Sequence, residues 1–89
     1  MATTRVTQAL AEILRGYVGR ANRNTTWFGD VIGRSQSHAS QVLLGKKAMS
    51  VDELMLACRA FGLTPSVVIR EAEGMADDES WQPKVPKAS

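Results

Sequence analysis

Two short helical segments joined by one tight turn constrain the fold of this chain more than any other feature of its sequence. The first segment is expected to start at residue 25 or 26 and to end at residue 32, because Gly33 readily takes the left-handed conformation of a helix C-terminus. The second is expected over residues 36–44, with Ser35 as its N-cap and Gly45 as its stop. The connection is so short that the two helices must cross close to each other.

Apolar and small residues indicate how these two helices meet. Phe28 and Ile32 would face a common core from the first helix, as would Ala39 and Val42 from the second. Gly29 is small enough to let the second helix approach the first. Two short helices that cross at a glycine-containing turn are typical of a helix-turn-helix motif.

The rest of the chain predicts further helices and no strand. An apolar stripe at spacings of three and four indicates a long helix over residues 4–21, capped by Thr3 or Thr4. A later helix should begin at the capping box of residues 50–53, and a last one should run from Pro65 to about residue 73. The capping-box helix would have a broad apolar face made of Val51, Leu54, Met55, Ala57, Cys58 and Phe61.

Length and charge indicate one domain followed by a tail of different character. A chain of 89 residues suffices for one core, and we expect residues 1–73 to form a compact, all-α, five-helix domain. Residues 1–70 hold nine basic and four acidic side chains, whereas residues 71–89 hold two basic and five acidic ones. We expect residues 74–89, which are acidic and contain prolines, to be irregular, with Trp81 docked on the protein's own surface.

The sequence shows no pattern of catalytic or metal-binding residues. Cys58 is the single cysteine and is expected in the core, so neither a disulfide nor a multi-cysteine metal site can form. His38 lacks a second ligand at a suitable spacing, and Asp52 and Glu53 are explained by helix capping. No glycine-rich phosphate loop or nucleophile elbow is present. We therefore expect no enzyme, no metal and no cofactor.

The chain also lacks the marks of membrane insertion or secretion. No apolar run approaches the ~20 residues that span a bilayer, and the N-terminus lacks the pattern of a signal peptide. A cytoplasmic location is expected.

The second helix of the motif would expose polar and mostly uncharged side chains. Amides and hydroxyls can hydrogen-bond to base edges in the major groove, and glutamine can pair with the N6 and N7 atoms of adenine. A helix of this composition after a well-placed turn favours reading of double-stranded DNA over a merely solvated face. The candidate base-reading residues are Gln36, Ser37, Ser40 and Gln41, with His38 at the flank.

At this point the sequence resembles the phage-repressor-like helix-turn-helix family, which includes the lambda repressor and Cro proteins. The resemblance covers residues 23–70, in the runs "TTWFGDVIGRSQSHASQVLLGKK" and "SVDELMLACRAFGLTP". It implies a lambda-repressor-like domain in which Gln36, Ser37 and Gln41 read bases. It also implies phosphate contacts near the recognition helix, for which basic residues at its flanks are suited. The candidate phosphate-contacting residues are Arg23, Asn24, Thr25, Thr26, Arg34, Ser35, Lys46 and Lys47.

Two features of the sequence concern further surfaces. Leu43 and Leu44 stand where the family usually has polar residues, and we expect them to pack on the first helix and Trp27 rather than to form a contact surface.

Three consecutive apolar residues in the last helix cannot all face its own core, so at least one should face outward. In phage members this region often forms a two-fold contact, which predicts a homodimer on a near-palindromic operator. The candidate dimer residues are Val67, Val68 and Ile69.

Together these features predict a transcriptional regulator of the phage or prophage repressor type, which acts by occupying operator DNA. One alternative is an antitoxin, whose acidic tail with Trp81 would wrap a toxin. Another is a protein-interaction module that uses Leu43, Leu44 and Trp27 as its contact surface.

Overall fold

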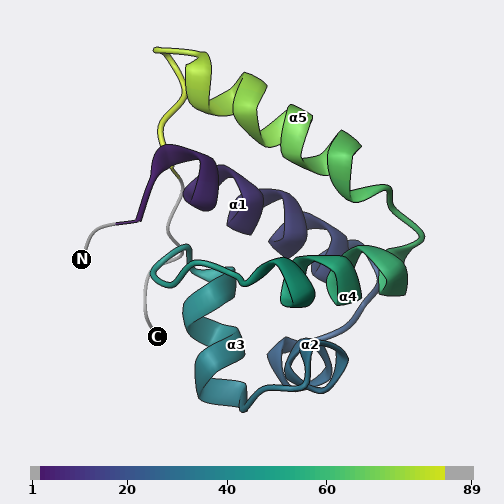
Figure 1. Ribbon diagram of the computed structural model, residues 1–89. Helices are drawn as coiled ribbons and strands as arrows, with labels where there is room; N and C mark the ends of the chain where they lie inside the picture. Colours follow the sequence, from purple (N-terminus) through teal and green to yellow (C-terminus); the bar gives the residue numbers. More distant parts are fainter. Residues whose placement is uncertain (1–2, 84–89) are drawn as a thin grey trace.

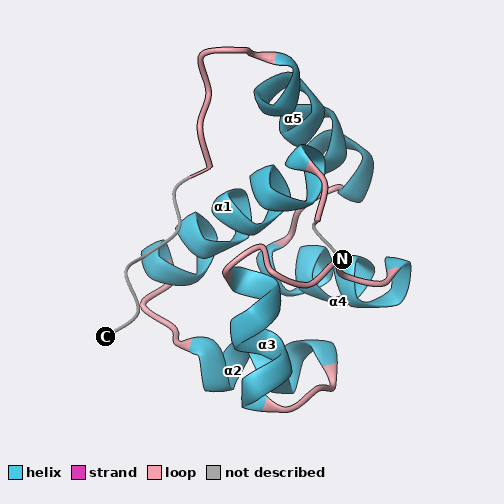
Figure 2. Cartoon of the chain, turned by 90° about the vertical axis from the view of Figure 1, so that its left-hand side faces the viewer, coloured by secondary structure: helices cyan, strands magenta, loops and turns pink. Residues whose placement is uncertain are grey.

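The computed structural model describes residues 3–83, which form five helices and, within that range, no strand. The all-α, five-helix fold expected from the sequence is confirmed. Helix α1 separates two parts of the molecule: α5 lies along one side of it, and α2 and α3 lie together on the other, with α4 beside them (Figures 1 and 2). The helices are α1 (Arg5–Arg20), α2 (Thr25–Ile32), α3 (Gln36–Leu43), α4 (Val51–Phe61) and α5 (Pro65–Asp77).

The helix starts lie where the sequence predicts them, because capping is a local interaction. The side chains of Thr4, Asn24, Ser35 and Ser50 each accept a hydrogen bond from a backbone amide three residues later. At the start of α4 the capping box is complete, since the Glu53 carboxylate accepts from the Ser50 amide in return.

The last helix is longer than the sequence suggested. Helix α5 continues through Gly74 to Asp77, whereas an end near residue 73 was expected. Packing against α1 explains the difference: Ala72 is fully buried, Met75 packs on the same cluster, and the Arg5 side chain donates to the Ala76 carbonyl. These tertiary contacts offset the low helix propensity of glycine. The smaller difference is in α3, which ends one residue before Leu44, its C-cap.

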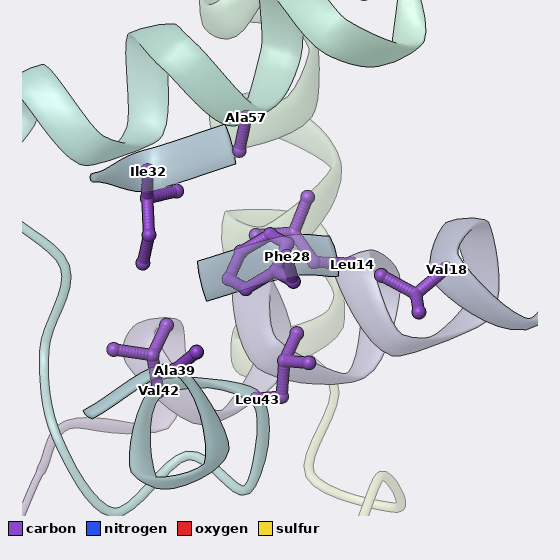
Figure 3. Close-up of a cluster of buried hydrophobic side chains, with 8 residues drawn as sticks. All are labelled: Leu14, Val18, Phe28, Ile32, Ala39, Val42, Leu43 and Ala57. Atoms are coloured by element: carbon purple, nitrogen blue, oxygen red, sulfur yellow. The ribbon is translucent and has the colours of Figure 1, made fainter. Parts of the chain in front are cut away.

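The core consists of two apolar clusters that share α1 and α4. The first joins α1 to the helix-turn-helix, with Phe28 and Leu14 fully buried at its centre (Figure 3). The second lies between α1, α4 and α5 and contains Cys58, which is fully buried as expected. The first cluster comprises Leu14, Val18, Phe28, Ile32, Ala39, Val42, Leu43 and Ala57, and the second Ala9, Ile13, Leu54, Cys58, Val68 and Ala72.

The inner face of α4 is narrower than predicted. Val51 is 76% exposed and Met55 is 50% exposed, although both were assigned to the apolar face. The buried side chains of α4 form one stripe around Ala57, and neither Val51 nor Met55 lies within it. Phe61 is only partly buried, and its ring lies 5.5 Å from that of Trp27, measured between centroids.

Residues 78–83, which follow α5, fold back onto α1, as expected for Trp81, and the rest of the expected irregular tail, residues 84–89, lies outside the described residues. The Trp81 indole Nε1 donates to a Glu12 carboxylate oxygen at 2.8 Å, and its ring lies under the Arg5 guanidinium. Arg5 also donates to the backbone carbonyls of Asp78 and Trp81. Within the segment predicted to be irregular, residues 78–81 are therefore held in place by specific contacts. None of the described helices is long and apolar enough to cross a membrane.

Candidate nucleic-acid interface

The turn between α2 and α3 depends on two glycines with different roles. Gly33 is the C-cap of α2 and has a φ of +70°, in the left-handed region where side chains with a Cβ are strained. Gly29 lies where α3 passes over α2: a Cβ on this residue would be 3.0 Å from the Arg34 carbonyl oxygen and 3.5 Å from the Ala39 Cβ. Both glycines were identified from the sequence for these roles.

Helix α3 turns one face to the core and leaves a polar face outside. Ala39 and Val42 are buried against the first cluster, as expected. Gln36 and Ser37, in the first turn, are exposed. The two candidates one turn later, Ser40 and Gln41, are half-buried and lie nearer to the edge of this face. The remaining candidate, His38, is placed differently from the others.

The side chain of His38 is directed to α4 and not outward, which corrects its assignment to the base-reading face. Its Nε2 atom lies 2.7 Å from a carboxylate oxygen of Glu53, and its side chain is only 12% exposed. Its Nδ1 atom lies 3.4 Å from a guanidinium nitrogen of Arg34. The sequence offered no signal for this contact, because it joins residues in different helices.

Glu53 is the one buried charged residue among residues 3–83. Burial alone would raise the pKa of its carboxyl group, but hydrogen bonds from the Ser50 amide, His38 and the Ser50 hydroxyl outweigh this effect. These hydrogen bonds hold the pKa of Glu53 below its ordinary value. The carboxylate is therefore ionised at neutral pH and holds His38 and Ser50 from two sides.

The basic candidates lie around the exposed start and end of α3. Lys46 and Lys47 are exposed in the loop after α3. Arg23 is exposed before α2, with its guanidinium 5.3 Å from the centre of the Trp27 ring. Arg34 lies in the turn with its side chain 53% exposed, and its Nε is 3.6 Å from the Glu53 carboxylate, an ion pair that the sequence did not predict.

The uncharged phosphate candidates are mostly committed to helix ends. Asn24 uses its side-chain oxygen to cap α2, and Ser35 uses its hydroxyl oxygen to cap α3. Thr25 is half-buried and Thr26 is exposed, both in the first turn of α2. The N-terminus of a helix is suited to a phosphate group, so the start of α2 stays a candidate for a phosphate contact although the Asn24 side chain already caps it.

A groove of about 340 Å³ runs between the end of α1, the start of α2 and α3. Leu43 is buried and lines the groove, and Arg15 donates to the Leu43 carbonyl. Leu43 therefore packs on α1 as expected, whereas Leu44 is half-buried in the groove wall. Arg15 was not identified from the sequence, since it differs in no visible way from the other basic residues of α1. The lining residues are Arg15, Val18, Gly19, Arg23, Asn24, Thr25, Ser40, Leu43 and Leu44.

The three consecutive apolar residues of α5 are not equivalent. Val68 is 3% exposed within the second cluster, so it is not available for a contact with another subunit, and its assignment to such a contact is corrected. Ile69 packs at the edge of the same cluster. Val67 is 57% exposed and is the residue that faces outward.

Comparisons with known proteins identify similar folds. No protein-family model matches the sequence, and no curated protein matches it. Two crystal structures of the clp gene regulator ClgR from Corynebacterium glutamicum have similar folds. One has 25% sequence identity and a TM-score of 0.69, over 78% of this chain and 73% of the other. The second has 23% identity and a TM-score of 0.70, over 83% and 96%. These similarities support the five-helix fold with its helix-turn-helix.

Proposed function

We propose that this protein binds double-stranded DNA in a sequence-specific manner through α3 and regulates transcription. The observation that carries the proposal is the exposed first turn of α3, where Gln36 and Ser37 follow a tight turn while Ala39 and Val42 hold the helix to the core. A helix fixed on one side and polar on the other can enter the major groove and bond to base edges.

The surrounding charges suit the phosphate backbone. Lys46 and Lys47 follow α3, and Arg23 precedes α2, so exposed cations flank the helix-turn-helix in the sequence. Contacts from such residues set the position of a helix in the groove, and the side chains of the helix read the sequence. This arrangement supports a division of the two tasks between different residues.

The similar structures support regulation over catalysis. Both are of a clp gene regulator, and the one with 25% identity covers most of this chain. We further propose that the protein is a repressor of the phage type, which acts by occupying the operator. Residues 3–83 contain no additional folded unit besides the five helices to receive a small-molecule signal.

The proposal includes a homodimer on a near-palindromic operator, with half-sites about 34 Å apart. The exposed Val67 supports it, because an apolar side chain at the surface of α5 can pair with its symmetry mate. Sedimentation of the protein alone and with operator DNA tests this part. A monomer in both samples would refute the dimer and leave the DNA proposal standing.

The two alternatives have less support. An antitoxin was considered because Trp81 could reach a partner, but Trp81 lies on α1 and its indole N–H is bonded to Glu12. An interaction module would need Leu43, Leu44 and Trp27 at the surface, but Leu44 is half-buried. Leu43 is buried, and Trp27 is partly buried against the first cluster.

Fluorescence anisotropy tests the main proposal. Labelled duplexes from the region upstream of the gene, and scrambled duplexes of equal composition, are titrated with protein across a salt series. Tight binding to the upstream duplex, weak binding to the scrambled one and a steep salt dependence are expected. Equal binding to both would refute sequence specificity, and no binding to either would refute DNA binding.

A further inference from the structure

Three side chains link the start of α3 to α4. The Arg34 guanidinium lies 3.4 Å from His38 Nδ1, and His38 Nε2 lies 2.7 Å from a Glu53 carboxylate oxygen. The same oxygen is 3.6 Å from Arg34 Nε, so the three groups form a closed set. We call them the Arg34-His38-Glu53 cluster. Two of its members, Arg34 and His38, stand directly before and after the segment that carries Gln36 and Ser37.

The donors and acceptors of the cluster match one form of the imidazole. A neutral ring protonated at Nε2 donates to the Glu53 carboxylate and accepts from Arg34 at Nδ1. A ring protonated at Nδ1 would place a donor against the guanidinium, which also only donates. The carboxylate of Glu53 therefore selects the ring form that keeps Arg34 in place.

Helix capping alone does not account for this arrangement. The capping box uses one carboxylate oxygen of Glu53, at 2.8 Å from the Ser50 amide, and a glutamine could fill that role equally well. The second oxygen serves His38 and Arg34. A buried charge is costly unless other groups bond to it, so its second set of partners is a distinct feature of the site.

We propose that Glu53 is a positioning residue for DNA reading. Through His38 and Arg34 it holds the first turn of α3 in one orientation, so that Gln36 and Ser37 meet the base edges in register. Glu53 itself is 7% exposed and does not reach the polar face of α3. This inference rests on the proposed function, because its consequence is the discrimination between DNA sequences.

The test uses E53Q with a matched control. The glutamine oxygen can still accept from the Ser50 amide, which turns its NH2 group to His38 Nε2. That nitrogen must then accept, the ring proton moves to Nδ1, and Arg34 is displaced. D52N is the control, because Asp52 is exposed in the same turn of α4 and its substitution removes the same charge.

Two measurements are made on the full chain. The first is the affinity for a duplex that the wild-type protein enriches from a random pool, relative to a scrambled duplex. The second is the ring form of the free protein, from long-range 1H–15N spectra at a pH where the ring is neutral. His38 is the single histidine in the sequence, so its signals are unambiguous. Circular dichroism checks that each variant is folded.

We expect E53Q to move the ring proton to Nδ1 and to lower the affinity ratio about tenfold, the effect of roughly one mismatched base pair. D52N should change neither result. An unchanged affinity ratio in E53Q, or a reduced ratio with an unchanged ring form, would overturn the proposal. If E53Q does not fold, the same affinity ratio is measured for His38→Asn, which leaves the capping box intact. An unchanged ratio in this variant overturns the proposal, and a reduced ratio supports it. Failure of the wild type to enrich any duplex would instead refute the proposed function, and the positioning role with it.

Discussion

Gly29 in α2 lies so close to the Arg34 carbonyl oxygen that any side chain at this position would crowd it. A Cβ at Gly29 would be 3.0 Å from that oxygen and 3.4 Å from the carbonyl oxygen of Ser35. Both oxygens belong to the backbone of the turn, which cannot move without shifting α3. The close approach of α2 and α3 thus depends on the absence of a side chain at this position.

We therefore predict that Gly29→Val lowers the free energy of unfolding by about 1–3 kcal/mol, the usual cost of overpacking. Gly74→Ala is the control, since Gly74 also lies inside a helix but a Cβ there would meet nothing within 4 Å. This control should stabilise the protein by up to about 1 kcal/mol. Urea denaturation measures both, and equal effects of the two substitutions would contradict the account of Gly29.

The predictable parts of this fold are those set by neighbours in sequence. Ser35 and Ser50 were expected as caps, and each accepts a hydrogen bond from the backbone amide three residues later. Gly33 was expected as a helix end because its conformation is local. The helical spacing of Ala39 and Val42, three residues apart, likewise predicted the buried side of α3.

The remaining parts depend on contacts between distant segments. The bond between His38 and Glu53 joins α3 to α4, and no periodicity in either helix indicates it. The spacing of apolar residues along α4 also does not predict how wide its buried stripe is. Met55 was therefore assigned to the apolar face, although it is 50% exposed. Arg5 stabilises the segment after α5 from the other end of the chain, which sequence reasoning could not show.

Substitution of Gln36 should reduce specificity. Gln36→Ala removes an exposed amide from the first turn of α3. It should weaken binding to the specific duplex by ~1–3 kcal/mol and leave binding to random DNA unchanged. Gln82→Ala, an exposed glutamine after α5, is the matched control and should change neither affinity. Anisotropy titrations measure both, and an equal loss on the two duplexes would show that Gln36 does not read a base.

Substitution of Lys46 should have the opposite profile. Lys46→Ala removes an exposed charge next to α3 and should weaken specific and random binding alike, with the salt slope reduced by about 1. Arg70→Ala removes the same charge from the exposed side of α5, on the far side of α1. The control should leave the slope unchanged. If Lys46→Ala has no effect on the slope, the loop does not contact phosphate.

The contacts of Trp81 and Arg5 should be coupled. Arg5 donates to the Trp81 carbonyl and lies over its ring, while the indole N–H donates to Glu12. Trp81→Phe keeps a ring but loses the indole donor, which should cost about 1 kcal/mol of unfolding free energy. A double-mutant cycle of Trp81→Phe with Arg5→Ala should give a non-zero interaction energy by urea denaturation, because the two residues are in contact. Strict additivity would mean that the two contacts form independently.

The acid sensitivity of the fold should depend on Glu53. Its pKa is lower in the folded protein than in the unfolded chain, because the bonds from Ser50 and His38 outweigh the effect of burial. The unfolded chain therefore binds the proton first as the pH falls below the ordinary glutamate value of about 4.3. Stability from this group is fully present above that value and is lost as the pH falls through the lower pKa of the folded state.

Glu53→Gln removes the titrating group and keeps the acceptor for the Ser50 amide. The variant should be less stable than the wild type at neutral pH, since the charged bond to His38 is lost. Its stability should also fall less steeply as the pH drops below the ordinary glutamate value of about 4.3, because the unfolded wild-type chain takes up the proton before the folded protein does. Thermal unfolding at a series of acidic pH values measures the stability of both proteins. If the stabilities of the two proteins change in parallel with pH, Glu53 is not a source of the acid sensitivity. We expect instead that the two stabilities converge at low pH, because the protonated Glu53 no longer offers His38 and Ser50 a carboxylate.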